Sequence, residues 1–149
     1  HLMAKNLTRL GNLKDAYRVY NKIVQLQPED TVANLKIAEF LLLGKKSEQA
    51  REKIVLVLEK EPENIEALLV KGQIFFQKKL VKKASDAFNK VLSISPQNIA
   101  AMQKLAQIHV IEKNYDNLAK NNTNVVVIDA EQSIEQVETD VWQAIKPLL

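Results

Sequence analysis

Residues 62–96 read PENIEALLVKGQIFFQKKLVKKASDAFNKVLSISP, and this stretch decides the fold class. Two apolar segments with the spacing of amphipathic helices lie between its two prolines. The first contains Gly72. The second contains Phe88 and ends before the second proline, because the residue before a proline is disfavoured in a helix. The stretch therefore predicts a helical hairpin with a turn at Lys78–Val81.

The same pattern recurs along the chain every 34 residues, as Pro28, Pro62 and Pro96 show. Four more sets of equivalent positions, which we call columns, are also spaced 34 residues apart. They are Ala16, Ala50 and Ala84; Tyr20, Ile54 and Phe88; Ile23, Val57 and Val91; and the small residues Ala4, Ala38, Gly72 and Ala106. Small residues let the two helices of a hairpin approach closely, and the large ones fill the space against the next unit. A single hairpin cannot bury its own apolar face, so the units must stack.

The second unit repeats the plan of the third. It predicts a first helix over Thr31 to Leu43, which ends at Gly44-Lys45-Lys46, where glycine tolerates the left-handed conformation of a helix cap. A second helix is expected to begin at Ser47-Glu48 and to end at Glu61-Pro62.

These residues resemble the tetratricopeptide repeat family, in which a 34-residue helix–turn–helix unit has small residues at the helix crossing and ends in proline. The resemblance covers roughly residues 4–113. It implies an all-α, right-handed solenoid of three to four hairpins in a single domain. The expected units are about 4–30, 31–64, 65–98 and 99–129.

Two parts of the chain depart from the family pattern. In the fourth unit Leu118, Asn122 and Ala130 stand where the alanine, the aromatic residue and the proline are expected. After it, residues 130–146 predict a C-terminal capping helix, and a β-strand over Val125–Ile128 is the alternative for the segment before it. The incomplete first unit indicates a fragment of a longer chain, and His1-Leu2-Met3 resembles residues left by a cloning vector.

Composition excludes several classes of function. The 149 residues include no cysteine, which removes disulfides, thiolate metal sites and thiol catalysis. The longest apolar runs are far shorter than the ~20 residues of a membrane span. A net charge of +3 does not predict a nucleic-acid partner. The compartment stays open: cytoplasmic or, if a targeting segment has been removed, periplasmic or exported.

Motifs for catalysis are missing from the sequence. It contains no glycine-rich phosphate loop, no metal-spaced ligand set and no nucleophile motif, so we expect neither an enzyme nor a cofactor. The histidines are His1 and His109. His109 falls in the column of Leu7, Leu41 and Phe75, so it is expected in or near the core.

The resemblance implies that the first helices of successive units line a concave groove that receives a peptide or protein segment. The groove residues carried over are Leu35, Glu39, Leu42 and Leu43, then Leu69, Gln73, Phe76 and Gln77, then Gln103, Gln107 and Val110. Leu35, Leu42, Leu69 and Phe76 lie off the main apolar stripe of their helices, which is typical of a helix that is sandwiched or binds a partner. The alternative is that they pack against neighbouring units.

The predicted function is therefore protein or peptide binding without catalysis. The alternative is an assembly role, with homo-oligomerisation through a solenoid end or the C-terminal helix. Repeat domains that bind acidic chaperone tails use a clamp of lysine, arginine and asparagine, and the corresponding positions here do not provide one. Over the last three units these positions hold Leu35, Glu39, Val70, Ala100 and Lys104, and over the first three His1, Lys5, Lys36, Glu66 and Val70.

Charged residues are segregated along the two edges of the predicted solenoid. Lysines, such as Lys45 and Lys79, fall at the turns inside units, and acids, such as Glu29 and Glu63, fall between units. The helix dipole explains this pattern, because acids precede the first helices and bases follow them. A basic rim for an acidic partner, phospholipid or RNA is the alternative, although apolar groove residues argue against RNA reading.

Overall fold

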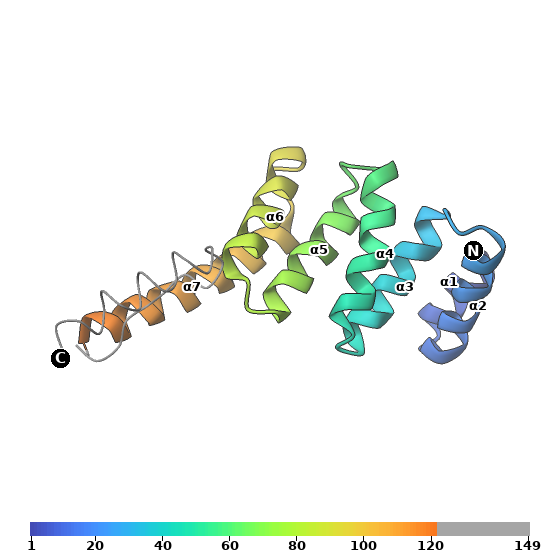
Figure 1. Cartoon of the computed structure of the whole chain (residues 1–149), viewed down its shortest axis with the longest axis horizontal. Coiled ribbons are helices and arrows are strands. Elements are labelled where there is room, and N and C mark those ends of the chain that lie inside the picture. Colours follow the sequence, from blue (N-terminus) through green and yellow to red (C-terminus); the bar gives the residue numbers. More distant parts are fainter. Residues whose placement is uncertain (122–149) are drawn as a thin grey trace, which may run out of the picture.

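The computed structural model describes residues 1–121, which form seven α-helices and no strand. Six of the helices pair into three hairpins, and the hairpins follow one another in a row (Figure 1). The helices are α1 (Leu2–Arg9), α2 (Leu13–Leu26), α3 (Thr31–Leu43), α4 (Ser47–Lys60), α5 (Ile65–Gln77), α6 (Val81–Ile94) and α7 (Ile99–Asn121). The all-α prediction is confirmed. The predicted capping helix, residues 130–146, and the alternative strand, Val125–Ile128, lie outside the described residues.

The turn inside each hairpin has the same backbone conformation. Gly11, Lys45 and Lys79, which are 34 residues apart, have φ angles of 78°, 57° and 62°. In the second hairpin the N–H of Lys46 donates to the carbonyl oxygen of Leu41 at 2.9 Å, the long hydrogen bond of a Schellman motif. The left-handed residue is thus Lys45 and not the preceding glycine as predicted, because this motif places it one residue beyond the C-cap.

The first helices begin with a repeated cap that the sequence analysis missed. The side chain of Asp30 accepts a hydrogen bond from the N–H of Ala33 at 2.7 Å, and Asn64 and Asn98 do the same one and two repeats later. Such caps satisfy an N–H that has no partner within the helix. Because the capping residues also keep the 34-residue step, the start of each first helix is fixed locally.

The small and large columns meet inside the third hairpin, whereas the large residues were expected to pack against the next unit. Ala38 and Gly72 are buried on the first helices, and Ile54 and Phe88 are buried on the second helices. A Cβ atom added to Gly72 would lie 2.5 Å from Cε1 of Phe88, closer than real Cβ contacts come. The crossing of α5 and α6 therefore needs a very small residue at this position, as predicted.

The fourth unit differs from the hairpin that was predicted. Helix α7 continues without a turn through Lys113, where the three hairpins turn. In this unit Leu118 stands in the sequence where the three hairpins have the alanine that lets a second helix pack closely. His109 and Ala106 are consequently exposed, so the predicted burial of His109 was wrong.

None of the described helices combines the length and the apolar character that crossing a bilayer requires.

Candidate functional site

The first helices α3, α5 and α7 form one continuous side of the row of hairpins, which we call the first-helix face. Helices α3 and α5 contact each other directly, although a second helix separates them in the chain. Helices α5 and α7 are linked by the ammonium group of Lys104, which lies 5.9 Å from the ring centroid of Phe76, within the range of a cation–π interaction. The predicted binding residues are therefore brought onto neighbouring helices.

Leu35 and Leu42 are core residues of the folded chain. Their exposed fractions are only 4% and 8%, and both belong to the apolar cluster that joins the first two hairpins and α5. The cause is the direct packing of α3 on α5, which covers the side of α3 that carries these two leucines. These two leucines offer almost no side-chain surface to a ligand, and the alternative of internal packing holds for them.

The other predicted residues of α3 reach the surface. Glu39 is half-buried, and Nζ of Lys36 donates to both of its carboxylate oxygens at 2.9 Å. Leu43, at the end of the helix, is 73% exposed. The α3 part of the face thus offers the apolar side chain of Leu43, next to Glu39, whose carboxylate is already paired with Lys36.

The α5 part of the face combines amide and apolar side chains. Leu69, Gln73 and Phe76 are half-buried, and the two apolar ones pack against the cluster formed with α6 and α7. Gln77 has a structural role, because its Nε2 donates to the carbonyl oxygen of Leu42 at 3.4 Å and its Oε1 accepts from Ser47 Oγ at 3.0 Å. These bonds tie the third hairpin to the turn of the second.

The predicted residues of α7 are the most accessible. Gln103, Gln107 and Val110 are all exposed, and Val110 is 59% exposed. Amide groups can donate to and accept from the backbone of a bound chain, and half-buried apolar side chains can contact its apolar residues. The remaining face is thus suited to recognition, and its carboxylate, Glu39, is already paired with Lys36.

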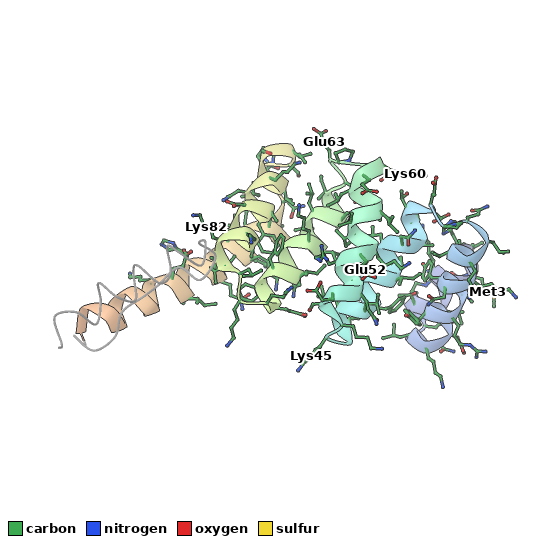
Figure 2. The ribbon with its side chains drawn as sticks, in the orientation of Figure 1. Met3, Lys45, Glu52, Lys60, Glu63 and Lys82 are labelled. Atoms are coloured by element: carbon green, nitrogen blue, oxygen red, sulfur yellow. The ribbon has the colours of Figure 1, made fainter. Side chains whose placement is uncertain are left out.

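Charged side chains also lie at the two edges of the row. Figure 2 shows Lys45 at one edge and Lys60 and Glu63 at the opposite edge. Lys60 donates to Glu29 at 2.5 Å and so joins the second hairpin to the first. This hydrogen bond holds the pKa of the Glu29 carboxyl below its ordinary value. The edge charges therefore act partly as links between hairpins.

A second such link joins the third hairpin to the second. Lys78 donates to Glu48, and this bond, with a smaller contribution from Arg51, lowers the pKa of the Glu48 carboxyl. No group of three or more histidine and acidic side chains within residues 1–121 is arranged to hold a metal ion.

A partly open cleft lies away from the first-helix face. It is formed by α4 and α5 and has a volume of about 380 Å³. The sequence analysis missed it, although the 34-residue columns carry a signal for it: charged residues at positions that are apolar in other units.

Comparisons with known proteins agree with this architecture. The family model described as the tetratricopeptide repeat matches residues 65–98. No curated protein sequence matches the chain. Among solved structures, the first tetratricopeptide domain of Spaghetti (RPAP3) bound to the HSP90 peptide SRMEEVD has a TM-score of 0.68 at 20% identity, with coverage of 74% of this chain and 88% of that one.

Two further structures have the same architecture. The first domain of human RPAP3 has a TM-score of 0.68 at 20% identity, covering 77% of this chain and 91% of that one. MamA 41-end from Desulfovibrio magneticus RS-1 has a TM-score of 0.69 at 23% identity, covering 83% and 70%. Identities this low establish the fold alone. Residues 65–98 thus match a tetratricopeptide repeat, and the chain has the helical-repeat fold of the tetratricopeptide structures.

Proposed function

We propose that this chain is a non-catalytic interaction module that binds a peptide or an extended protein segment along the first-helix face. The observation that carries the proposal is the continuity of this face. Helix α3 packs on α5, Lys104 links α5 to α7, and the accessible side chains on α5 and α7 include amides and large apolar groups. A bound chain could contact all three helices at once.

The contact surface that we propose is smaller than the sequence implied. It omits the buried Leu35 and Leu42 and the structurally engaged Gln77. It keeps Leu43, Glu39, Leu69, Gln73, Phe76, Gln103, Gln107 and Val110, which are exposed or half-buried. Two structural neighbours support a peptide ligand, because the first RPAP3 domain is bound to an HSP90 peptide and the second human RPAP3 domain is in complex with an HSP70 peptide.

A matched pair of double variants tests the proposal. Peptides selected from a phage-displayed library on the wild-type chain are measured by fluorescence anisotropy against both variants. Gln73→Lys/Gln107→Lys places two long cations on the first-helix face, whereas Gln25→Lys/Gln49→Lys makes the same change at exposed positions on α2 and α4. We expect at least a tenfold loss of affinity for the first variant only. Equal affinities for both variants would move the site elsewhere.

The ligand is not expected to be an acidic chaperone tail. Two of the corresponding positions hold the buried Leu35 and Val70, and Lys36 is already paired with Glu39. Labelled SRMEEVD peptide should therefore give no anisotropy change at concentrations up to about 100 µM, roughly 5.5 kcal/mol of binding free energy. Saturable binding below that concentration would contradict this specificity.

Self-assembly is a second proposal, and an observation on the first hairpin favours it. Leu10 and Leu26 in the first hairpin are 78% and 77% exposed, so this hairpin presents apolar side chains to solvent. Such surface is typical of an interface. Light scattering over a concentration series separates the two proposals, because a mass that stays at one chain up to the highest concentration eliminates assembly and leaves peptide binding intact.

A further inference from the structure

The cleft between α4 and α5 has an apolar floor and a charged rim. Ile54, Val55 and Leu58 line it from α4, and Ile74 and Phe75 line it from α5. Its volume of about 380 Å³ is near the lower end of the ~300–1,000 Å³ range of small-molecule pockets, enough for one or two large side chains.

The cleft opens on the side of α5 that lies opposite the first-helix face. At 3.6 residues per turn, Lys71, Ile74 and Phe75 project from one side of the helix, and Gln73 and Phe76 project from the other. A ligand in the cleft would therefore not compete with a ligand on the first-helix face. The two sites can be tested independently.

The equivalent space one repeat earlier is filled by aromatic rings. Between α2 and α3, Phe40 packs edge-on against Tyr17 with ring centroids 6.0 Å apart, and its ring lies 6.2 Å from that of Tyr20. Thirty-four residues later, Phe40 and Tyr17 correspond to Ile74 and Arg51. We call the filled space between α2 and α3 the first junction. The cleft exists because the rings of Phe40 and Tyr17 are replaced between α4 and α5 by Ile74, which is smaller, and by Arg51, which extends to solvent.

The replacements also bring positive charge to the rim. Lys71 occupies the column of Ile37, which is buried, and of Leu105, which is half-buried, yet Lys71 is exposed. Within residues 1–121 the ammonium group of Lys71 forms no ion pair. Arg51 uses Nε for a 3.0 Å bond to Glu48 and keeps its terminal N–H donors. Two cations from opposite helices thus flank the apolar floor.

We propose that this cleft is a second binding site, for a short acidic segment of a partner protein that inserts a large apolar side chain. The apolar side chain covers the floor, and flanking carboxylates pair with Lys71 and Arg51. The rim also carries Glu59. A peptide can donate backbone hydrogen bonds to Glu59 and can also place carboxylates near Lys71 and Arg51. A fatty acid has a carboxylate for these cations but no donor for Glu59.

Methyl NMR of the 149-residue protein tests the site with a defined peptide probe. The probe is an acetylated, amidated hexapeptide with a Leu-Phe core flanked on each side by two aspartates. We expect saturable shifts of the methyl resonances of Val55, Leu58 and Ile74, and none at Leu43 or Val110 of the first-helix face. A matched peptide with lysine flanks should bind at least fivefold more weakly. Equal binding of the two peptides, or of decanoate, would overturn the proposal.

Variants that fill the cleft, as the first junction is filled, provide a second test of the site. Arg51→Tyr/Ile74→Phe introduces the residues of the filled junction and should abolish the shifts, and Val55→Trp at the rim does so without changing a buried residue. Lys71→Ile, which copies Ile37, should weaken binding about two- to fivefold, as expected for the loss of one exposed ion pair. Thermal unfolding checks that each variant folds. Unchanged shifts in a folded Val55→Trp variant, or shifts that depend on protein concentration without peptide, would refute the site.

Discussion

The hairpins α3–α4 and α5–α6 share a backbone plan but fill their crossings differently. Both turn through a lysine in the left-handed conformation, and both begin with a side-chain cap one residue before the first helix. At the crossing, the third hairpin places Gly72 against Phe88, and the equivalent positions of the second hairpin hold Ala38 and Ile54. All four residues are buried.

This comparison shows that the repeat keeps the space at the crossing and not the residues that fill it. A methyl group lost from the first helix is compensated by a larger side chain on the second. The contact of Gly72 with the Phe88 ring is tight enough that even a Cβ atom would force one of them to shift. Substitutions in one column must therefore depend on the residue in the other.

Removing the large partner should have the largest effect. Phe88→Ala empties the crossing of the third hairpin and should lower the free energy of unfolding by about 3–5 kcal/mol, and Ile54→Ala in the second by about 2–5 kcal/mol. Urea denaturation measures both. If Phe88→Ala cost less than ~1 kcal/mol, the crossing would collapse around the cavity and the tight packing described here would be incorrect.

Enlarging the small partner comes next. Gly72→Leu should destabilise by about 1–3 kcal/mol, because the added side chain meets the fixed ring of Phe88. The double variant Gly72→Ala/Phe88→Ile copies the second hairpin, so its loss should be smaller than the sum of the two single losses. A double-mutant cycle by urea denaturation measures this coupling. Additive losses would show that the two columns are independent.

The turns shared by the two hairpins predict a smaller gain. Lys45→Gly and Lys79→Gly should each stabilise by about 0.5–1 kcal/mol, because glycine adopts positive φ without strain, and this exceeds the entropy cost of glycine in the unfolded chain. Lys46→Gly is the control, since Lys46 has a φ of −92° and should lose stability when replaced. Thermal unfolding that shows no difference between Lys45→Gly and Lys46→Gly would argue against the shared turn.

The ion pair between the two hairpins should have the smallest effect, and it depends on pH. The folded state lowers the pKa of Glu48, so the pair with Lys78 contributes stability above the ordinary glutamate pKa of about 4.3. That contribution is lost as the pH falls through the lowered value. Glu48→Gln should reduce the unfolding free energy near neutrality, and its difference from the wild type should shrink as the pH falls below the ordinary glutamate pKa. A difference that did not change with pH would exclude this ion pair as its cause.

Much of the fold was predictable because it depends on local signals. Residue types that cap, turn or end helices act over a few positions, and the 34-residue step repeats them. The helices at Thr31–Leu43 and from Ser47 were predicted with the bounds that the structure has. The straight run of α7 was not predicted, because the earlier turns use lysine as well as glycine and the sequence at Lys113 looks equally able to turn.

The candidate site was predictable only in outline. The 34-residue step placed the chosen residues on the first helices, but it did not show that α3 packs directly on α5 and buries Leu35 and Leu42. Nor did it show that Gln77 would bridge two hairpins. An exposed leucine and a buried one have the same helical spacing, so periodicity alone could not separate them.

The sequence by itself determined that this chain forms stacked helical hairpins, where helices such as Thr31–Leu43 begin and end, and which positions carry small and large residues. Only the tertiary structure decided which apolar side chains reach solvent and where a cleft opens between units. The reason is that helix formation depends on residues within a few positions of one another, whereas exposure and cleft volume depend on how side chains from separate hairpins fill the space between them.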